Sequence, residues 1–414
     1  MKYFSHLNTA TGIILDYRGE EPLHLFLKRF FSQHTKFGSK DRKRISQLCY
    51  VFYRTARAFG NDSLIKEAGK IHEIIVAGLF LCTNMYDELL AIMKPEWNEK
   101  IHLSLPEKRN LMLEDVTVAT PEFQQLFPLV HELSDEIDKE KFPLSHLQQP
   151  DLFIRIRPGY YEAIIQKLEE QEAEFEFIPP FTIRLPNGFK VDEIFEIDKE
   201  VVVQDLNSQR VGGFLQLATA RIMIPGDALP SEQDKNSLIT SLWDCCAASG
   251  GKSILAQDIL GNIDLTVSDL REPILANLKK RFKVAGINRY KSFVADLSTT
   301  SRPLPIANYD IILADLPCTG SGTWSRTPEQ LYFFDASSIE KYSQLQKRIV
   351  VNIIPQLKED GKLLYVTCSV FKKENEDIIQ FITEKFPLKI DKMELFKGYD
   401  VKADTMFAAI LSPL

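Results

Sequence analysis

The segment Tyr309–Thr323, YDIILADLPCTGSGT, decides the fold predicted for this chain. It opens with an apolar run, Ile311–Ala314, and continues through Asp315-Leu316-Pro317-Cys318 into a loop with two glycines. An apolar run of this length that ends in Pro and Gly is typical of a buried strand in a parallel sheet. Open α/β sheets bind their ligands at the carboxyl ends of such strands. The segment therefore predicts an α/β domain with a functional site at Asp315 and Cys318.

From Ser241 onward the chain alternates between strand and helix patterns. The expected strands are Leu242–Cys246, Leu265–Ser268, Ser292–Ala295, Tyr309–Ala314 and Lys362–Thr367, with Met406–Ile410 as a candidate for one more. The expected helices are Ser253–Leu260, Glu272–Val284, Ser337–Leu357 and Lys373–Phe386. Repeated β-α-β units of this kind predict a doubly wound, Rossmann-like parallel sheet.

Acids end the first three of these strands, at Asp244, Asp269 and Asp296. A loop of small residues, Cys246–Lys252, follows the first, and its glycines allow a ligand to approach the backbone closely. Asp269 lies 25 residues after Asp244, a spacing at which an acid accepts hydrogen bonds from ribose hydroxyls. The pattern favours a ligand that contains a nucleoside, with capping and turn roles for the acids as the alternative. The loop lacks the glycine spacing of a P-loop.

A second thiol, Cys368, follows the expected strand Lys362–Thr367. A single cysteine at a strand end is usually a small buried apolar residue. If this strand neighbours the one that ends at Asp315, however, Cys318 and Cys368 face one crevice. Two thiols beside an acid and a nucleoside pocket indicate a nucleophile whose thiolate is formed by local tuning.

Three parts of the chain differ in pattern: a helical part over residues 1–145, a small α+β module over 146–225, and the α/β domain over 226–414. Helices are expected at Leu23–Ser32, His72–Met93, Pro128–Lys141 and from Ser39, whose apolar positions leave the arginines and lysines on the opposite face. Between Lys36 and Arg57 there are seven basic residues and one acid. Such a run is either a solvated helix face or an RNA-binding surface.

Composition narrows the class of protein. The 414 residues carry a net charge of −7, so no overall positive field draws the chain to nucleic acid. The longest apolar run, Ile74–Cys82, is too short to cross a bilayer, and the first residues lack the apolar core of a signal peptide. The six cysteines form neither a zinc pattern nor a disulfide framework. We expect free thiols, a cytoplasmic location and no metal site.

Several motifs together resemble the RsmB/Nop/Sun group of RNA cytosine-C5 methyltransferases, which use S-adenosylmethionine. The matching segments are DCCAASGGKS at 244–253, SDLREPILANLKKR at 268–281, Asp296, DLPCTGSGT at 315–323, TCSVFKKENED at 367–377 and VQDLNSQ at 203–209. The two cysteine motifs are specific when found together. The helical part, through SKDRKRISQLCYVFYR, resembles the NusB-like RNA-binding domain of the bacterial RsmB subgroup.

The resemblance implies a role for each matching residue. The S-adenosylmethionine pocket would be lined by Cys246, Ala247, Ala248, Ser249, Gly250, Gly251, Lys252, Asp269, Asp296 and Asp315. Cys368 would attack carbon 6 of the target cytosine, which makes carbon 5 nucleophilic. Asp315 would also hydrogen-bond the base, and Cys318 would assist loss of the carbon 5 proton or release of the enzyme. The implied partner is RNA, small-subunit ribosomal RNA first and transfer RNA second.

Two alternatives remain open at this point. A Pro-Cys pair is the nucleophile motif of DNA cytosine methyltransferases, so Cys318 rivals Cys368 for the attack. A non-catalytic RNA-binding assembly factor would keep the fold without the chemistry, although two aligned thiols argue against it. A nucleotide-binding oxidoreductase is disfavoured because the first strand lacks G-x-G-x-x-G.

Two departures from the family pattern stand out. Ser249 occupies a position where the family usually has Pro, which is expected to loosen a turn beside the cofactor. The loop Pro225–Asn236 is longer than usual.

Overall fold

The computed structural model describes residues 2–60, 65, 67–115, 119–220, 239–299 and 308–414, and the expected loop Pro225–Asn236 lies outside them. The chain forms two compact units. The first comprises Met1–Leu133, Ile137–Gln149 and Thr323–Ala336, and the second comprises Ser134–Glu136, Pro150–Gly322 and Ser337–Leu414.

The first unit is helical, as the sequence predicts. Its α-helices are α1 (Lys2–Asp16), α2 (Leu23–Gln33), α3 (Ser39–Thr55), α4 (Ala68–Cys82), α5 (Glu88–Met93), α6 (Pro95–Glu99), α7 (Leu105–Glu114), α8 (Lys141–Ser145) and α14 (Pro328–Tyr332). The expected helix His72–Met93 is two helices, because the carboxylate of Asp87 caps a new one by accepting from the N–H groups of Leu89 and Leu90. The helix expected at Pro128–Lys141 is wrong, since that range has a 3₁₀ turn at Val130–Glu132 and the next α-helix, α8, begins only at Lys141.

The basic run Lys36–Arg57 does not form one solvated face. Arg54 is 7% exposed and donates to the backbone carbonyls of His146 and Gln148. Arg57 donates to the carbonyls of residues 331 and 332, and Arg44 forms a two-bond ion pair with Asp87. The expectation that all the arginines lie opposite the apolar face is therefore wrong, because buried carbonyls and an acid from other elements recruit three of them.

The second unit begins with a four-stranded antiparallel sheet of strand order β2-β3-β1-β4. Its strands are β1 (Leu152–Ile156), β2 (Glu176–Ile178), β3 (Thr182–Leu185) and β4 (Val201–Val203). Helices α9 (Tyr161–Glu170) and α10 (Val191–Ile194) complete this module, and Ile164 and Leu168 of α9 are fully buried in its core. The α+β content matches the sequence pattern.

A seven-stranded sheet of order β10-β11-β9-β8-β5-β6-β7 forms the rest of the second unit. Its strands are β5 (Thr240–Asp244), β6 (Ile263–Asp269), β7 (Lys291–Val294), β8 (Tyr309–Asp315), β9 (Leu357–Thr367), β10 (Leu388–Phe396) and β11 (Met406–Pro413). The five strands from β5 to β9 pair in parallel, while β11 pairs antiparallel with both β9 and β10. The Rossmann-like sheet is thus confirmed, with a carboxyl-terminal hairpin whose strand β10 was not expected.

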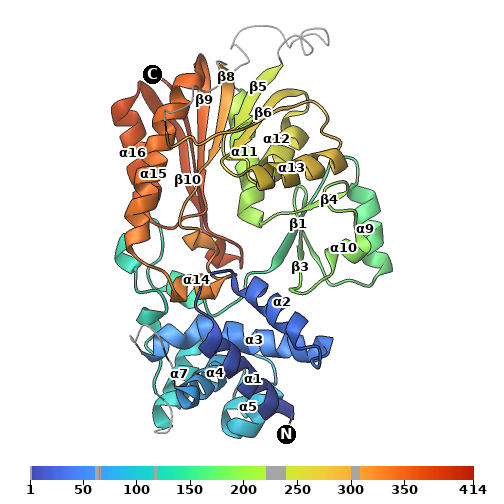
Figure 1. Cartoon of the computed structure of the whole chain (residues 1–414), viewed down its shortest axis with the longest axis vertical. Helices are drawn as coiled ribbons and strands as arrows, with labels where there is room; N and C mark the ends of the chain where they lie inside the picture. The colour runs from blue at the N-terminus through green and yellow to red at the C-terminus, as the bar shows by residue number, and fades with distance from the viewer. Residues whose placement is uncertain (1, 61–64, 66, 116–118, 221–238, 300–307) are drawn as a thin grey trace. The chain divides into compact units, whose positions relative to one another are not determined.

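Helices cover both faces of this sheet (Figure 1). Helices α15 (Ser337–Ile353) and α16 (Glu376–Lys385) lie on one side, and α11 (Leu206–Ala220), α12 (Gly251–Leu260) and α13 (Glu272–Val284) lie on the other. The central strand β8 is covered on both faces, and Ile311–Ala314 has no exposed surface, which explains why its sequence is apolar without alternation.

The order of the strands fixes where a ligand can bind. The chain passes from β5 to β6 and β7 on one side, then returns to place β8 on the other side of β5. The switch point of this sheet therefore lies between β5 and β8, where Asp244 and Asp315 end their strands.

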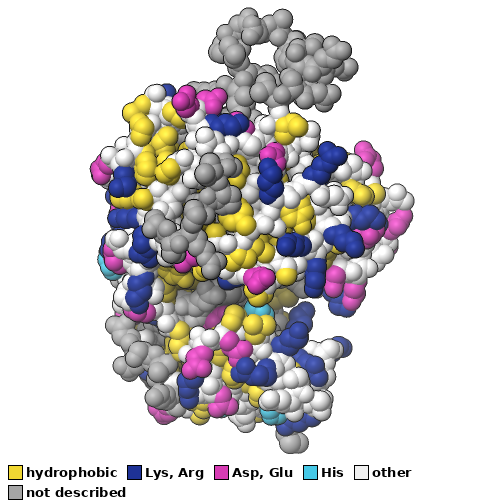
Figure 2. Space-filling view, turned by 45° about the horizontal axis from the view of Figure 1, so that its top comes forward, with side chains coloured by type: hydrophobic (Ala, Val, Ile, Leu, Met, Phe, Trp, Pro, Cys, Tyr) yellow, Lys and Arg dark blue, Asp and Glu magenta, His cyan; other side chains and the backbone are white. Residues whose placement is uncertain are grey.

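Two surface properties bear on partners. Within the described residues, no helix combines the length and the apolar character that crossing a membrane requires. On the face shown in Figure 2, lysine and arginine side chains are interspersed with acidic ones rather than gathered in one continuous patch.

Candidate active site

The two cysteine motifs meet at the carboxyl edge of the large sheet. Strands β8 and β9 are parallel neighbours, with Asp315 opposite Val366, so both run their carboxyl ends to the same edge. Cys318 lies three residues beyond Asp315, and Cys368 directly follows β9. Their sulfur atoms are 3.4 Å apart, within hydrogen-bonding distance. The sequence predicts that the two thiols face one crevice if their strands are neighbours, and the structure shows that the strands are neighbours.

Close backbone contacts hold the Cys318 loop against this edge. The N–H of Gly322 donates to the carbonyl of Cys368 at 2.8 Å, and the N–H of Leu316 donates to the carbonyl of Val366 at 3.0 Å. A β-carbon at Gly322 would lie 1.9 Å from the carbonyl oxygen of Thr405. Only glycine therefore allows the loop to approach so closely.

The two thiols differ in electrostatic environment. The hydrogen bond with Cys368, burial, and the charges of Cys368 and Glu374 raise the pKa of Cys318 well above its usual value. Cys318 is therefore a neutral thiol at neutral pH, able to donate its proton toward the sulfur of Cys368.

A lysine from α12 joins Asp315 to this cluster. The Nζ atom of Lys252 is 2.7 Å from Oδ2 of Asp315. Burial alone lowers the pKa of Lys252, but the charge and hydrogen bond of Asp315, with a smaller contribution from Cys368, outweigh it and raise the pKa. Lys252 is therefore a cation paired with the acid, and it lies close enough to Cys368 for the two groups to interact electrostatically.

The loop before α12 is shaped by left-handed backbone. Gly250 has φ of +84° and precedes the first turn of α12, and a β-carbon there would lie 2.7 Å from the ring of Phe282. Ala248 also has a positive φ, and its N–H donates to Oδ2 of Asp269 at 3.1 Å. The residues Cys246–Lys252 thus curve around the carboxyl ends of β5 and β6.

Asp244 and Asp269 lie on either side of that loop. Asp244 is 1% exposed, and its Oδ2 accepts from the hydroxyl of Ser253, while its buried Oδ1 has no hydrogen-bond partner in the described chain. Burial raises the pKa of Asp244 to about 7. Asp269 accepts from the backbone N–H and the guanidinium of Arg271, whose side chain is 58% exposed. Both carboxyl groups are close to the loop, as the sequence predicts.

Asp296 is in a different setting. It is exposed and accepts from the N–H and hydroxyl of Ser298, in a turn of its own making. These hydrogen bonds lower its pKa. The geometry shows the turn role that the sequence left as an alternative.

The hydroxyl of Ser249, a group that proline lacks, accepts a hydrogen bond. Its hydroxyl and carbonyl oxygens both accept from Nη1 of Arg281 at 3.0 Å, and the same guanidinium forms a two-bond ion pair with Asp198. Arg281 thus ties the loop to the small α+β module, while the loosening expected from Ser in place of Pro stays a prediction.

A buried polar network lies next to the two thiols. The sequence analysis assigns its members no role beyond their place in the motif at 367–377. Glu374 and Asn375 have no exposed surface. Glu374 accepts from Thr319 and Ser369, and Asn375 contacts the hydroxyl of Thr367 at 2.6 Å. Two features of the sequence could have indicated this network. A residue with a hydroxyl group directly follows each cysteine, and a Glu-Asn pair, which is ordinarily solvated at the start of a helix, comes a few residues later.

The VQDLNSQ motif has a structural part to play. Asp205 accepts from the N–H of Asn207 and so caps the start of α11. The side-chain amide of Asn207 is fully buried and donates to the carbonyl of Asp404 at 2.7 Å. This bond ties α11 to the segment that directly precedes β11.

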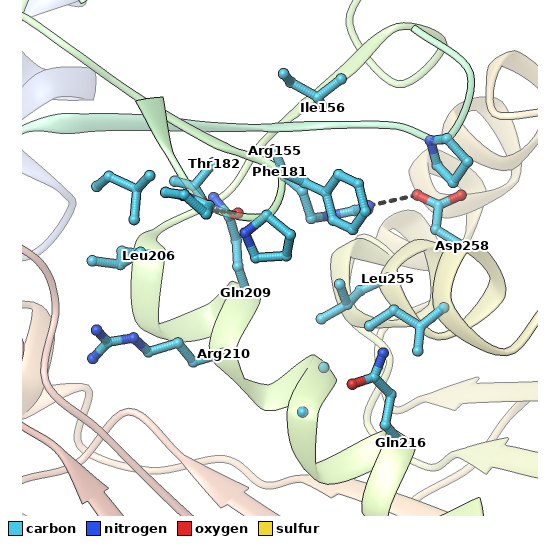
Figure 3. Close-up of a pocket in the computed structure, with 17 residues that line it drawn as sticks. Arg155, Ile156, Phe181, Thr182, Leu206, Gln209, Arg210, Gln216, Leu255 and Asp258 are labelled. Atoms are coloured by element: carbon cyan, nitrogen blue, oxygen red, sulfur yellow. Dashed lines mark hydrogen bonds and ion pairs between the residues drawn. The ribbon is translucent and has the colours of Figure 1, made fainter. Parts of the chain in front are cut away.

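A cavity of about 350 Å³ lies elsewhere in the second unit, between the small sheet and helices α11 and α12 (Figure 3). Its walls include Phe181, Gly213 and the buried ion pair between Arg155 and Asp258 at 2.7 Å. No sequence-predicted site residue lines it. The predicted chemistry therefore belongs to the sheet edge and not to this cavity.

Comparison with known proteins bears on the same half of the chain. Residues 230–411 match the family model described as 16S rRNA methyltransferase RsmB/F. The chain is 27% identical over 206 residues to ribosomal RNA small subunit methyltransferase F of Psychromonas ingrahamii. The aligned region covers 48% of this chain and 41% of that protein. It is 27% identical over 276 residues to ribosomal RNA small subunit methyltransferase B of Proteus mirabilis, covering 64% of this chain and 60% of that protein. The chain spans about half the length of the curated relatives it matches.

Solved structures agree on the fold. The protein named PH0851 superposes with a TM-score of 0.69 at 18% identity, covering 98% of both chains. NSun6 from Pyrococcus horikoshii superposes with a TM-score of 0.55 at 16% identity, covering 69% of this chain and 97% of that one.

The family model begins at residue 230, so the NusB-like character of residues 1–145 stays a prediction. The matched region contains both cysteines, the loop before α12 and the acids that end β5 and β8. Residues 230–411 are thus the part of this chain that is similar to the RsmB/F family of methyltransferases.

Proposed function

We propose that this chain transfers a methyl group from S-adenosylmethionine to carbon 5 of a cytosine in RNA, with small-subunit ribosomal RNA as the substrate class. The observation that carries the proposal is the pair of thiols 3.4 Å apart beside Asp315 and Lys252. The names of the curated relatives, which are ribosomal RNA small subunit methyltransferases, support the substrate class.

The residues at the switch point fit S-adenosylmethionine. The left-handed backbone at Gly250 turns the loop into α12, and the buried Oδ1 of Asp244 is an acceptor without a donor in the described chain. Asp269 presents a carboxylate at the end of β6, held on one side by an exposed arginine. When bound, S-adenosylmethionine supplies an electrophilic methyl group.

Each polar group beside the thiols then has a task. The thiolate of Cys368 forms a bond to carbon 6 of the cytosine, and the electron pair of the 5,6 double bond moves toward carbon 5 and the ring. Asp315 hydrogen-bonds the base and stabilises the charge that develops on it. Methylation at carbon 5 is followed by loss of the carbon 5 proton, which breaks the bond to Cys368 and restores the aromatic ring. The base must leave its stack to reach these groups.

Cys318 fits the role of base for that last proton. The charge of the Cys368 thiolate is one cause of the raised pKa of Cys318. When Cys368 is bonded to the cytosine, its sulfur is a neutral thioether and this cause is gone. Loss of this cause lowers the pKa of Cys318 relative to its value beside a Cys368 thiolate. Cys318 then gives its own proton to solvent, and the resulting thiolate accepts the proton from carbon 5.

Two single substitutions test the proposal. Cys318→Ala is expected to block release and leave a covalent protein–RNA adduct that survives denaturing electrophoresis. Cys368→Ala is expected to give no adduct, because the bond to carbon 6 cannot form. An adduct in Cys368→Ala and none in Cys318→Ala would exchange the two roles.

The substrate is tested by incubating the chain and labelled S-adenosylmethionine with total RNA from a strain that lacks the gene. Label is expected in small-subunit ribosomal RNA at one or more cytosines. Label in transfer RNA alone would move the substrate to that class, and no label in any RNA would leave an assembly factor as the function.

A further inference from the structure

Glu374 connects the two cysteine motifs through a single buried carboxylate. It ends the 3₁₀ turn Lys372–Glu374 just before α16, and none of its surface is exposed. Its Oε1 accepts from the N–H of Thr319 at 2.9 Å, and its Oε2 accepts from the hydroxyl of Thr319 at 2.6 Å. The same Oε2 accepts from the hydroxyl of Ser369.

The donors are the residues that directly follow the two cysteines. Thr319 follows Cys318 and Ser369 follows Cys368, so one carboxylate ties both backbones together from the buried side. The residue that follows Thr319 in the Cys318 loop is Gly320, which forms a turn with φ of +72°. We propose that Glu374 is a positioning residue that holds the sulfur atoms of Cys318 and Cys368 at reaction distance, an inference that rests on the proposed function.

The charge of Glu374 serves the same end. It contributes to the raised pKa of Cys318, so the residue that fixes the pair also favours the neutral form of one member. Burial raises the pKa of Glu374 itself, against the lowering effect of its three hydrogen bonds. The carboxylate thus makes the two thiols chemically different while it keeps them adjacent.

Neighbouring contacts allow the fold to survive a change at Glu374. Asn375 holds the end of β9 independently, through the hydroxyl of Thr367 and the carbonyl of Ser369. The hydroxyl of Ser321 accepts from the N–H of Val370 at 2.9 Å and links the same two loops. A glutamine at 374 keeps the shape of the side chain but has only one acceptor oxygen. With that oxygen at the place of Oε2 it still accepts from both hydroxyls, but its amide group then faces the N–H of Thr319, and that hydrogen bond is lost.

Phenylarsine oxide measures the distance between the thiols without methyl transfer. One arsenoxide reacts with two adjacent thiols, forming two As–S bonds and releasing one water, so its affinity depends on how well the sulfurs are preset. Wild-type chain is expected to bind one more arsenical per chain than Cys318→Ser. Because both chains keep the adjacent thiols of Cys245 and Cys246, this difference removes any arsenical bound there. Glu374→Gln and Glu374→Ala are expected to weaken this binding at least tenfold, and Glu374→Asp less.

Glu376→Gln is the matched control. Glu376 lies two residues away, and its carboxylate accepts from Ser134 at 2.9 Å instead of from the residues that follow the cysteines. It is expected to leave arsenical binding unchanged, and circular dichroism and thermal unfolding of all variants report whether the fold is kept. Folded Glu374→Ala with wild-type arsenical affinity would overturn the proposal.

Methyl transfer gives the second readout. Glu374→Gln is expected to lower kcat at least tenfold with little change in KM for RNA or for S-adenosylmethionine, because binding groups are intact while the thiols are misplaced. A rise in KM alone would overturn the positioning role. If the wild-type chain transfers no methyl group to RNA, the proposed function fails, whereas the arsenical result still decides whether Glu374 fixes the thiol pair.

Discussion

The carboxyl group of Asp244 is 1% exposed at the end of β5, and only one of its two oxygens has a partner in the described chain. Burial raises its pKa from 3.8 to about 7, so the folded chain keeps a proton that the unfolded chain releases. Stability from this proton is fully present below about pH 4 and is lost as the pH rises toward about 7, since the unfolded state binds fewer protons over that window. A ligand that donates to the free oxygen would favour the charged form instead.

Asp244→Asn tests this pH dependence. The amide is neutral at every pH, so the variant is expected to gain stability relative to wild type as the pH rises from about 4 to 8, by at most ~4 kcal/mol. Its carbonyl can still accept from Ser253, which keeps the native contact. Chemical unfolding of both chains at a series of pH values measures the difference, and a difference that stays constant with pH would contradict the assignment.

At the scale of elements, the start of α12 depends on one glycine. Gly250 has φ of +84°, and a β-carbon there would meet the ring of Phe282 at 2.7 Å. The adjacent Gly251 has ordinary space, with its nearest neighbour 4.0 Å away. The loop over β5 therefore has its shape from position 250 and not from the glycine pair as such.

Gly250→Ala is expected to lower stability by about 2 kcal/mol, since left-handed backbone alone costs an L-residue ~1–2 kcal/mol and the ring of Phe282 must also move. Because the loop borders the methyl-donor site, affinity for S-adenosylhomocysteine is expected to fall as well. Gly251→Ala is the control for stability, which it should leave nearly unchanged. Thermal unfolding and titration calorimetry give the two values, and equal effects from the two variants would contradict the prediction.

At the scale of the whole molecule, the segment Thr323–Ala336 belongs to the helical unit although it lies in the sequence between the two cysteine motifs. The ring of Tyr332 packs near Phe52 and Tyr53 of α3, with centroid distances of 5.9 and 5.4 Å, and its hydroxyl accepts from the N–H of Ile65. The helical unit is thus completed by a piece of chain that follows the Cys318 loop directly.

Tyr332→Ala is expected to destabilise the helical unit by roughly 3 kcal/mol, the cost of removing a buried aromatic ring. Hydrogen exchange followed by mass spectrometry should show faster exchange in α3. Ile349→Ala, a buried residue of α15 in the second unit, is the comparison and should speed exchange in α15 instead. Faster exchange in α15 after Tyr332→Ala would place the segment energetically with the second unit.

Strand and helix patterns were predictable wherever packing is local. The apolar run of β8 needs burial on both faces, and α13 was expected at its observed bounds, Glu272–Val284. Strand β10 was not expected, because Leu388–Phe396 is an edge strand in which four charged residues interrupt the apolar ones. Its pairing with β11 also depends on the folded hairpin and not on the local pattern. The helix expected at Pro128–Lys141 failed because apolar spacing alone does not reveal the turns that tertiary contacts impose.

Strand periodicity, glycine freedom and the acids are properties of the local chain, so they predict the parallel sheet, the loop before α12 and the residue types at the strand ends. Which of those residues meet depends on the packing of distant segments. This packing placed β8 beside β9, and so brought two thiols 50 positions apart to 3.4 Å, while it left Asp296 in a turn of its own. It also turned Glu374 inward and drew Arg54 into the helical core, because buried donors and acceptors must find partners wherever the fold provides them.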